Sequence, residues 1–171
     1  MAEGEFVLVN EHLTAAMQKH PMGWNPVGDH EIYVLLADVA AEKRDETMLG
    51  MYAPQAEAIS ARLEHTLYRA IALRSLGVLD ELHGRTVLAE ARLKESYDLF
   101  QKLEARWQMG RTLFELGQLS AMVGRSGEAS EYFAQAANEL ESLGARPLLE
   151  RVRTFMEGRQ LPGHSPPVIG N

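Results

Sequence analysis

The stretch LGVLDELHGR, residues 76–85, is matched forty residues later by LGQLSAMVGR, residues 116–125. Both begin with Leu-Gly, carry a second leucine at the fourth position and end with Gly-Arg. A repeat period between 20 and 50 residues is typical of solenoids and other repeat arrays. The two stretches therefore predict a chain that is built from copies of one supersecondary unit.

The match extends well beyond the two quoted stretches, over residues 70–109 and 110–149. The identical pairs are Leu73/Leu113, Leu76/Leu116, Gly77/Gly117, Leu79/Leu119, Gly84/Gly124, Arg85/Arg125, Ala89/Ala129, Leu103/Leu143, Ala105/Ala145 and Arg106/Arg146. A degenerate third copy precedes them, in which Leu36-Ala37 replaces Leu-Gly and Arg44-Asp45 replaces Gly-Arg. We therefore expect three repeats of about forty residues.

Each copy predicts two helices, because its apolar positions recur at spacings of three and four. In the second half of one copy these positions are Ala89, Leu93, Ser96, Phe100 and Leu103. Gly77 and Gly117 fall inside the first helix, where a glycine allows the backbone of a neighbouring helix to approach closely. Gly84 and Gly124 are expected to cap the C-terminus of that helix, and Thr86 and Ser126 to cap the N-terminus of the next.

The expected fold is all-α, a right-handed solenoid of three helical hairpins with a C-terminal capping helix. Pro54 is expected to kink or restart the second helix of the first repeat. The domain organisation that follows is an N-terminal segment at 1–29 (a short helix and a loop), repeats at 30–69, 70–109 and 110–145, a capping helix at 146–159 and a disordered tail at 160–171. The apolar face of the capping helix comprises Leu148, Leu149, Val152, Phe155 and Met156.

The pattern resembles the tetratricopeptide repeat family, whose unit is a helix–turn–helix. Residues 110–141 match it best, with Leu113, Leu116-Gly117, Gly124, Ala129, Phe133 and Ala136 at the signature spacings. Three features depart from the family: Asp80 or Ser120 stands at the signature aromatic position, the end-of-repeat proline is missing, and the period of forty exceeds the usual 34. The longer period is similar to that of arrays attached to bacterial signalling ATPases and nucleotide cyclases.

Composition narrows the classes of function. The 171 residues include 24 acidic and 17 basic side chains, for a net charge of −7, which disfavours nucleic acid as a partner. There is no cysteine and no run of about 20 apolar residues, so we expect a cytoplasmic protein that does not span a membrane.

No phosphate-binding loop, nucleophile elbow or metal-binding histidine spacing is present, and we expect no cofactor, no metal and no enzymatic activity. Acidic pairs such as Asp80-Glu81 are expected to be solvated.

The resemblance implies a protein-interaction module whose first helices line a concave groove for a peptide or a partner domain. The arginines of such a groove would bind carboxylates of the partner. Alternatively, Phe114 packs on a neighbouring helix and the arginines are rim charges. The groove residues implied are Val34, Asp38, Arg74, Val78, Glu81, Arg111, Phe114 and Gln118.

Two other functions remain open. One is self-assembly into a homodimer through the N-terminal end, where residues 6–9 are apolar and the first repeat is the weakest. The other is a ligand-sensing regulatory domain of a bacterial signalling system.

Overall fold

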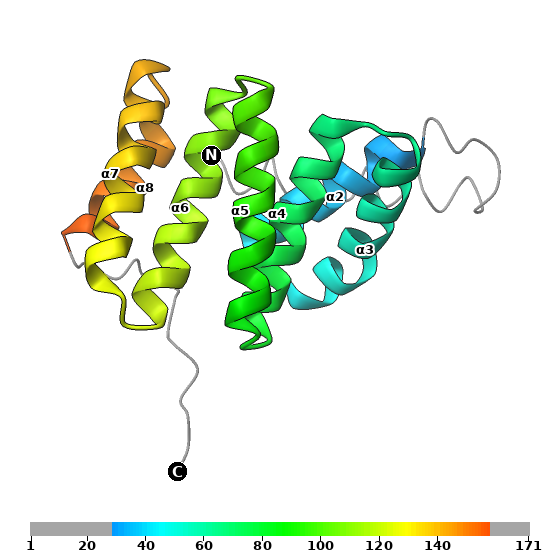
Figure 1. Ribbon diagram of the computed structural model, residues 1–171, viewed down its shortest axis with the longest axis horizontal. Helices are drawn as coiled ribbons and strands as arrows, with labels where there is room; N and C mark the ends of the chain where they lie inside the picture. Colours follow the sequence, from blue (N-terminus) through cyan, green and yellow to red (C-terminus); the bar gives the residue numbers. More distant parts are fainter. Residues whose placement is uncertain (1–28, 158–171) are drawn as a thin grey trace, which may run out of the picture. The chain divides into compact units, whose positions relative to one another are not determined.

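The computed structural model describes residues 29–157 as seven helices in two compact units (Figure 1). The first unit, to residue 104, contains α2 (Asp29–Lys43), α3 (Glu46–Arg62), α4 (Thr66–Leu82) and α5 (Thr86–Lys102). The second, from residue 105, contains α6 (Arg106–Met122), α7 (Ser126–Ser142) and α8 (Arg146–Met156). The expected N-terminal helix and loop and the expected disordered tail at 160–171 lie outside the described residues.

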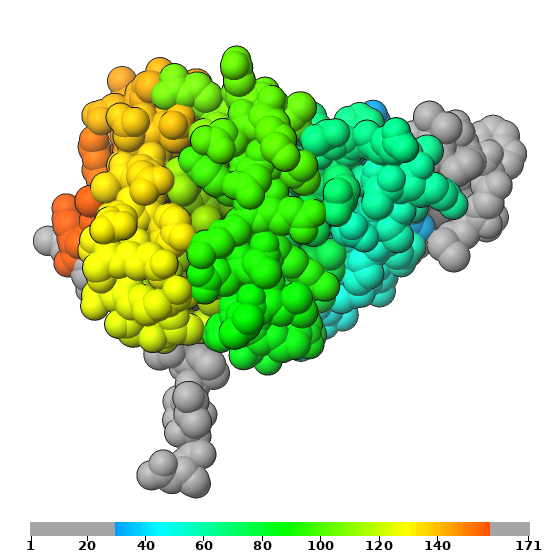
Figure 2. All heavy atoms as spheres, viewed as in Figure 1, coloured from blue at the N-terminus to red at the C-terminus, as the bar shows by residue number. Residues whose placement is uncertain are grey.

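Consecutive helices pack against each other within each unit, which confirms the predicted all-α solenoid fold. In the first unit α2 and α4, the first helices of two hairpins, also pack side by side. The second helices α3 and α5 form the face of this unit that is turned toward the viewer in Figure 2. The first helices α4 and α6 begin four residues before the repeat boundaries at 70 and 110. None of the described helices is both long and apolar enough to cross a membrane.

The turns between helices recur every twenty residues. Each contains one residue with a positive φ, and these residues are Arg44, Glu64, Gly84, Glu104, Gly124 and Gly144. The backbone N–H of Arg85 donates to the carbonyl of Asp80 at 2.8 Å, and Arg125 donates to Ser120 at the same distance. This six-residue closure is the Schellman motif, which confirms the predicted role of Gly84 and Gly124.

The predicted N-caps were wrong by one residue. Arg85 and Arg125 occupy the N-cap positions and make no side-chain capping bond, while Thr86 and Ser126 are already inside the helix. The reason is that the turns at 83–85 and 123–125 contain only three residues each. The arginine directly after the glycine is therefore the last residue before the next helix.

The glycines inside the first helices make room for side chains of the second helices, whereas the prediction was a close approach of the neighbouring backbone. A β-carbon at Gly77 would lie 2.7 Å from Cγ of Leu93, and one at Gly117 would lie 2.5 Å from Cε1 of Phe133. Contacts this short do not occur between real atoms of these types. Leucine and phenylalanine therefore pack directly on the backbone of the preceding helix.

Two further expectations need correction. Pro54 does not restart a helix, because α3 is continuous from Glu46 to Arg62. Proline has no N–H to donate to the carbonyl of Gly50 four residues earlier, and both Gly50 and Pro54 lie on the exposed side of the helix. Met156 of α8 is half exposed instead of facing inward, although Leu148, Leu149 and Val152 are buried as predicted. Met156 corresponds to Leu116 of α6, and no second helix follows α8 within residues 29–157 to cover it.

Candidate partner-binding surface

The predicted groove residues of the first unit are mostly buried. Val34 of α2 and Val78 of α4 have 1% and 0% of their surface exposed, and Arg74 has 2%. Glu81 is also buried, while the Asp38 side chain keeps 20% exposed. These side chains pack within the unit, so of the five only Asp38 offers a partner appreciable surface.

The predicted groove charges of the first unit belong to a series of polar links between its two hairpins. The residues in each link are 36 or 37 positions apart, close to one repeat period. The links are Glu31 with Tyr68, Asp38 with Arg74, Arg44 with Glu81, and Glu46 with His83. They recur along α2 and α4 and extend to the following turns, and so fix the register of one hairpin against the next.

Two links place ionisable groups in unusual surroundings. The guanidinium of Arg74 donates to Oδ1 of Asp38 at 2.8 Å and lies 5.3 Å from the ring centroid of Phe100. Burial raises the pKa of Glu81, and the charge and hydrogen bond of Arg44 offset part of that rise. The second carboxylate oxygen of Glu81, Oε2, has no hydrogen-bond partner.

In the second unit the predicted residues divide into two groups. Phe114 is buried in an aromatic cluster, with ring centroids 5.9 Å from Phe133 and 5.3 Å from Phe155, and the guanidinium of Arg151 lies over its ring. This is the alternative stated above, in which Phe114 packs on neighbouring helices. Arg111 and Gln118 are only partly buried and bond along their own helix, to Gln108 at 3.3 Å and to Glu115 at 3.4 Å.

Sequence reasoning expected the acidic pair Asp80-Glu81 to be solvated, but both residues are buried. Asp80, expected to be solvated, is fully buried and bonded by the guanidinium groups of Arg85 and Arg92. It stands at the signature aromatic position of the resembled family, which is an interior position, and this departure was the signal that could have revealed it. In the next repeat Ser120 takes the same position and donates to Glu128 at 2.9 Å.

The repeated Gly-Arg pair therefore has two functions in the fold. The glycine adopts the positive φ of the turn, and the arginine binds a carboxylate beside it. Arg85 binds Asp80 at 2.7 Å, and Arg125 binds Glu128 at 2.7 Å. The arginines are thus occupied in structural ion pairs.

The fold and this polar network define an α-helical repeat protein. No family model matches the sequence, and no similar sequence was found among curated proteins. A solved structure of similar fold is the crystal structure of BtubC (BKLC) from P. vanneervenii, at 17% identity and a TM-score of 0.57. The match covers 99% of this chain and 82% of that chain. At this identity the likeness shows the fold alone, and membership of the tetratricopeptide repeat family stays a prediction.

Proposed function

We propose that the protein is a non-catalytic interaction module of the cytoplasm, in which the first helices bind a peptide or a domain of a partner protein. The observation that carries this proposal is the partly exposed pair Arg111 and Gln118 on α6, a first helix of the repeat array. In such arrays a layer of equivalent helices provides an extended binding surface. In the first unit the polar links described above hold the equivalent first helices α2 and α4 in one arrangement.

The exposure of the predicted groove residues decides which of them could contact a partner. Arg74, Val78 and Phe114 are core residues, and replacing them would test the fold rather than the binding. Arg111 and Gln118 share one face of α6, seven residues apart, and keep part of their surface exposed. An arginine and an amide in this arrangement can bind a carboxylate and a backbone carbonyl of a peptide.

The experiment is an affinity pull-down from lysate of the source cells with wild type, Arg111→Glu and Arg146→Glu. The control replaces an exposed arginine at the start of α8 and makes the same change in charge. A partner that is lost with Arg111→Glu and kept with Arg146→Glu supports the proposal. A partner that both variants retain, or the absence of any partner, contradicts it.

Self-association is a second candidate, favoured by two exposed apolar side chains of the first hairpin. Leu35 of α2 is 51% exposed and Met51 of α3 is 49% exposed. A second copy of the chain could cover them. Light scattering at increasing concentration distinguishes the cases: a dimer that Leu35→Glu dissociates supports this candidate, and a monomer at every concentration rules it out.

A further inference from the structure

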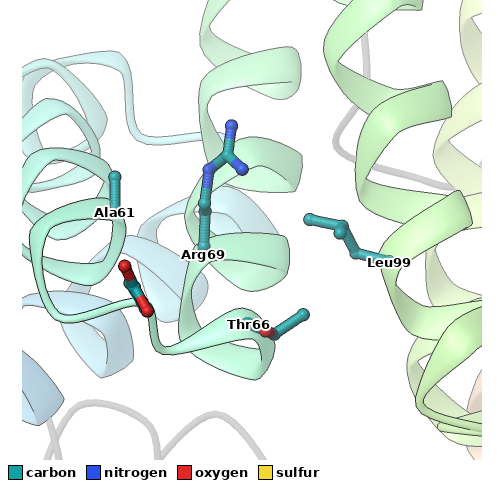
Figure 3. A pocket seen from close by; sticks show the side chains of 5 residues that line it. Ala61, Thr66, Arg69 and Leu99 are labelled. Carbon is teal, nitrogen blue, oxygen red and sulfur yellow. The ribbon is translucent and has the colours of Figure 1, made fainter.

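A shallow pocket lies between the second helices α3 and α5 of the first unit. Its volume is about 220 Å³, and its lining comprises Ala61, Glu64, Thr66, Arg69 and Leu99. Figure 3 shows Ala61 and Leu99 on opposite sides, with Thr66 and Arg69 of α4 between them. The pocket therefore has apolar walls and a polar floor.

The positive charge of Arg69 on this floor is neutralised by carboxylates of the same unit. Nη2 of Arg69 lies 2.8 Å from Oε1 of Glu95 on α5, and its Nε lies 3.5 Å from Oε1 of Glu57 on α3. Glu64 adds a third carboxylate at the rim. Two carboxylates thus pair with one guanidinium, and with Glu64 the acidic side chains in and beside the pocket outnumber Arg69.

Two exposed leucines lie close in sequence to residues that line the pocket. Leu63 directly precedes Glu64 and is 39% exposed, while Leu103 follows Leu99 by one helical turn and is 43% exposed. Leu143 stands at the same repeat position in the second unit and is similarly exposed. An exposed leucine therefore recurs at the end of each second helix of the repeat.

We propose that this pocket is a second docking site, for a short segment of a partner protein that carries an apolar side chain between two basic residues. The apolar side chain enters between Ala61 and Leu99. The basic residues pair with Glu64 and with Glu95, whose side chain is 48% exposed. The acidic rim and the net charge of −7 both favour a basic partner over an acidic one.

The test is a titration of the ¹⁵N-labelled full chain, followed by amide chemical shifts, with the peptide acetyl-Lys-Leu-Lys-amide. Two matched peptides serve as controls: acetyl-Glu-Leu-Glu-amide reverses the charge, and acetyl-Lys-Ser-Lys-amide removes the apolar side chain. We expect saturable shifts confined to the amides near residues 61–69 and 99. Binding should be about tenfold weaker for each control peptide.

Two variants separate this pocket from a general attraction of basic peptides to an acidic chain. Leu99→Lys places a like charge inside the pocket, and Val87→Lys adds the same charge to an exposed position at the other end of α5. Loss of the shifts with Leu99→Lys and their retention with Val87→Lys supports the proposal. Absence of saturable shifts, equal shifts with all three peptides, or equal weakening by both variants would overturn it. None of these outcomes depends on the first-helix surface of the second unit.

Discussion

Arg74 of α4 donates a hydrogen bond to Asp38 of α2 across 2.8 Å, although the arginine has only 2% of its surface exposed. The two residues lie 36 positions apart and belong to consecutive hairpins. A buried guanidinium needs a partner of opposite charge, so this pair couples the folding of one hairpin to the next.

Asp38→Ala should lower the free energy of unfolding by about 2–3 kcal/mol, because it leaves a buried guanidinium without its carboxylate partner. The double variant Asp38→Ala with Arg74→Met should recover most of that loss, since the buried guanidinium is then removed as well. Urea unfolding of both variants measures the difference. Equal losses for the single and double variants would show that the pair is not coupled.

Gly117→Ala should destabilise the fold by about 1–3 kcal/mol, because the new β-carbon overlaps the ring of Phe133. Gly50→Ala in α3 is the matched control, since a β-carbon there meets nothing within 4 Å. That control should stabilise the helix by up to about 1 kcal/mol. Thermal unfolding of the two variants should therefore shift in opposite directions; a shift of the same sign would contradict the packing described here.

Glu104→Gly should raise stability by about 1 kcal/mol, because Glu104 adopts a φ of +52° that costs a non-glycine residue energy. Gly84→Ala, at the equivalent position of the turn one helix earlier, should cost about the same amount. Denaturant midpoints measured on the two variants check the prediction. The Glu104 side chain is exposed, and a β-carbon at Gly84 would meet nothing within 4 Å. Packing contacts therefore contribute to neither change in stability.

The stability contributed by Glu81 should depend on pH with a definite sign. Burial raises its folded-state pKa above the ordinary value of 4.5, so the folded protein holds this proton more tightly than the unfolded chain. The contribution is therefore complete below pH 4.5 and is lost as the pH rises through the raised pKa. Glu81→Gln cannot titrate, so its stability relative to wild type should increase across that window; a constant or falling difference in urea unfolding would exclude this account.

Phe155→Ala should lower stability by about 1–2 kcal/mol, because it removes one of three packed rings between α6, α7 and α8. Met156→Ala, at the next position but half exposed, should change stability by less than about 0.5 kcal/mol. Circular dichroism during heating compares the two. Similar losses would indicate that the end of α8 is covered by something other than this aromatic cluster.

The repeat made most of the architecture predictable from sequence. The glycines at 84, 124 and 144 and the leucine stripes repeat at a fixed period, and such a pattern constrains turns and helices directly. The caps were displaced by one residue because the sequence does not show how many residues a turn consumes. The helix restart considered for Pro54 does not occur, because an exposed carbonyl tolerates the loss of its hydrogen bond.

The candidate site was less predictable, for a physical reason. Arg74, Asp80 and Glu81 are charged residues on helices, and their sequence pattern is the same whether they meet solvent or each other. Their burial depends on partners 5 to 37 residues away, which a helical periodicity does not reveal. Arg111 and Gln118, by contrast, stayed partly exposed as expected for a surface.

The regular twenty-residue spacing of the turns has a consequence for how such a chain can change its length. Because α4, α6 and α8 begin at residues 66, 106 and 146, any block of forty residues cut between two turns carries the same two junctions. Duplicating such a block preserves the phase of every later helix, whereas an insertion of one or two residues inside a helix rotates the side chains that follow it in that helix. A genetic duplication or an engineered extension could therefore lengthen the protein by whole forty-residue repeats without changing the sequence of any turn between helices.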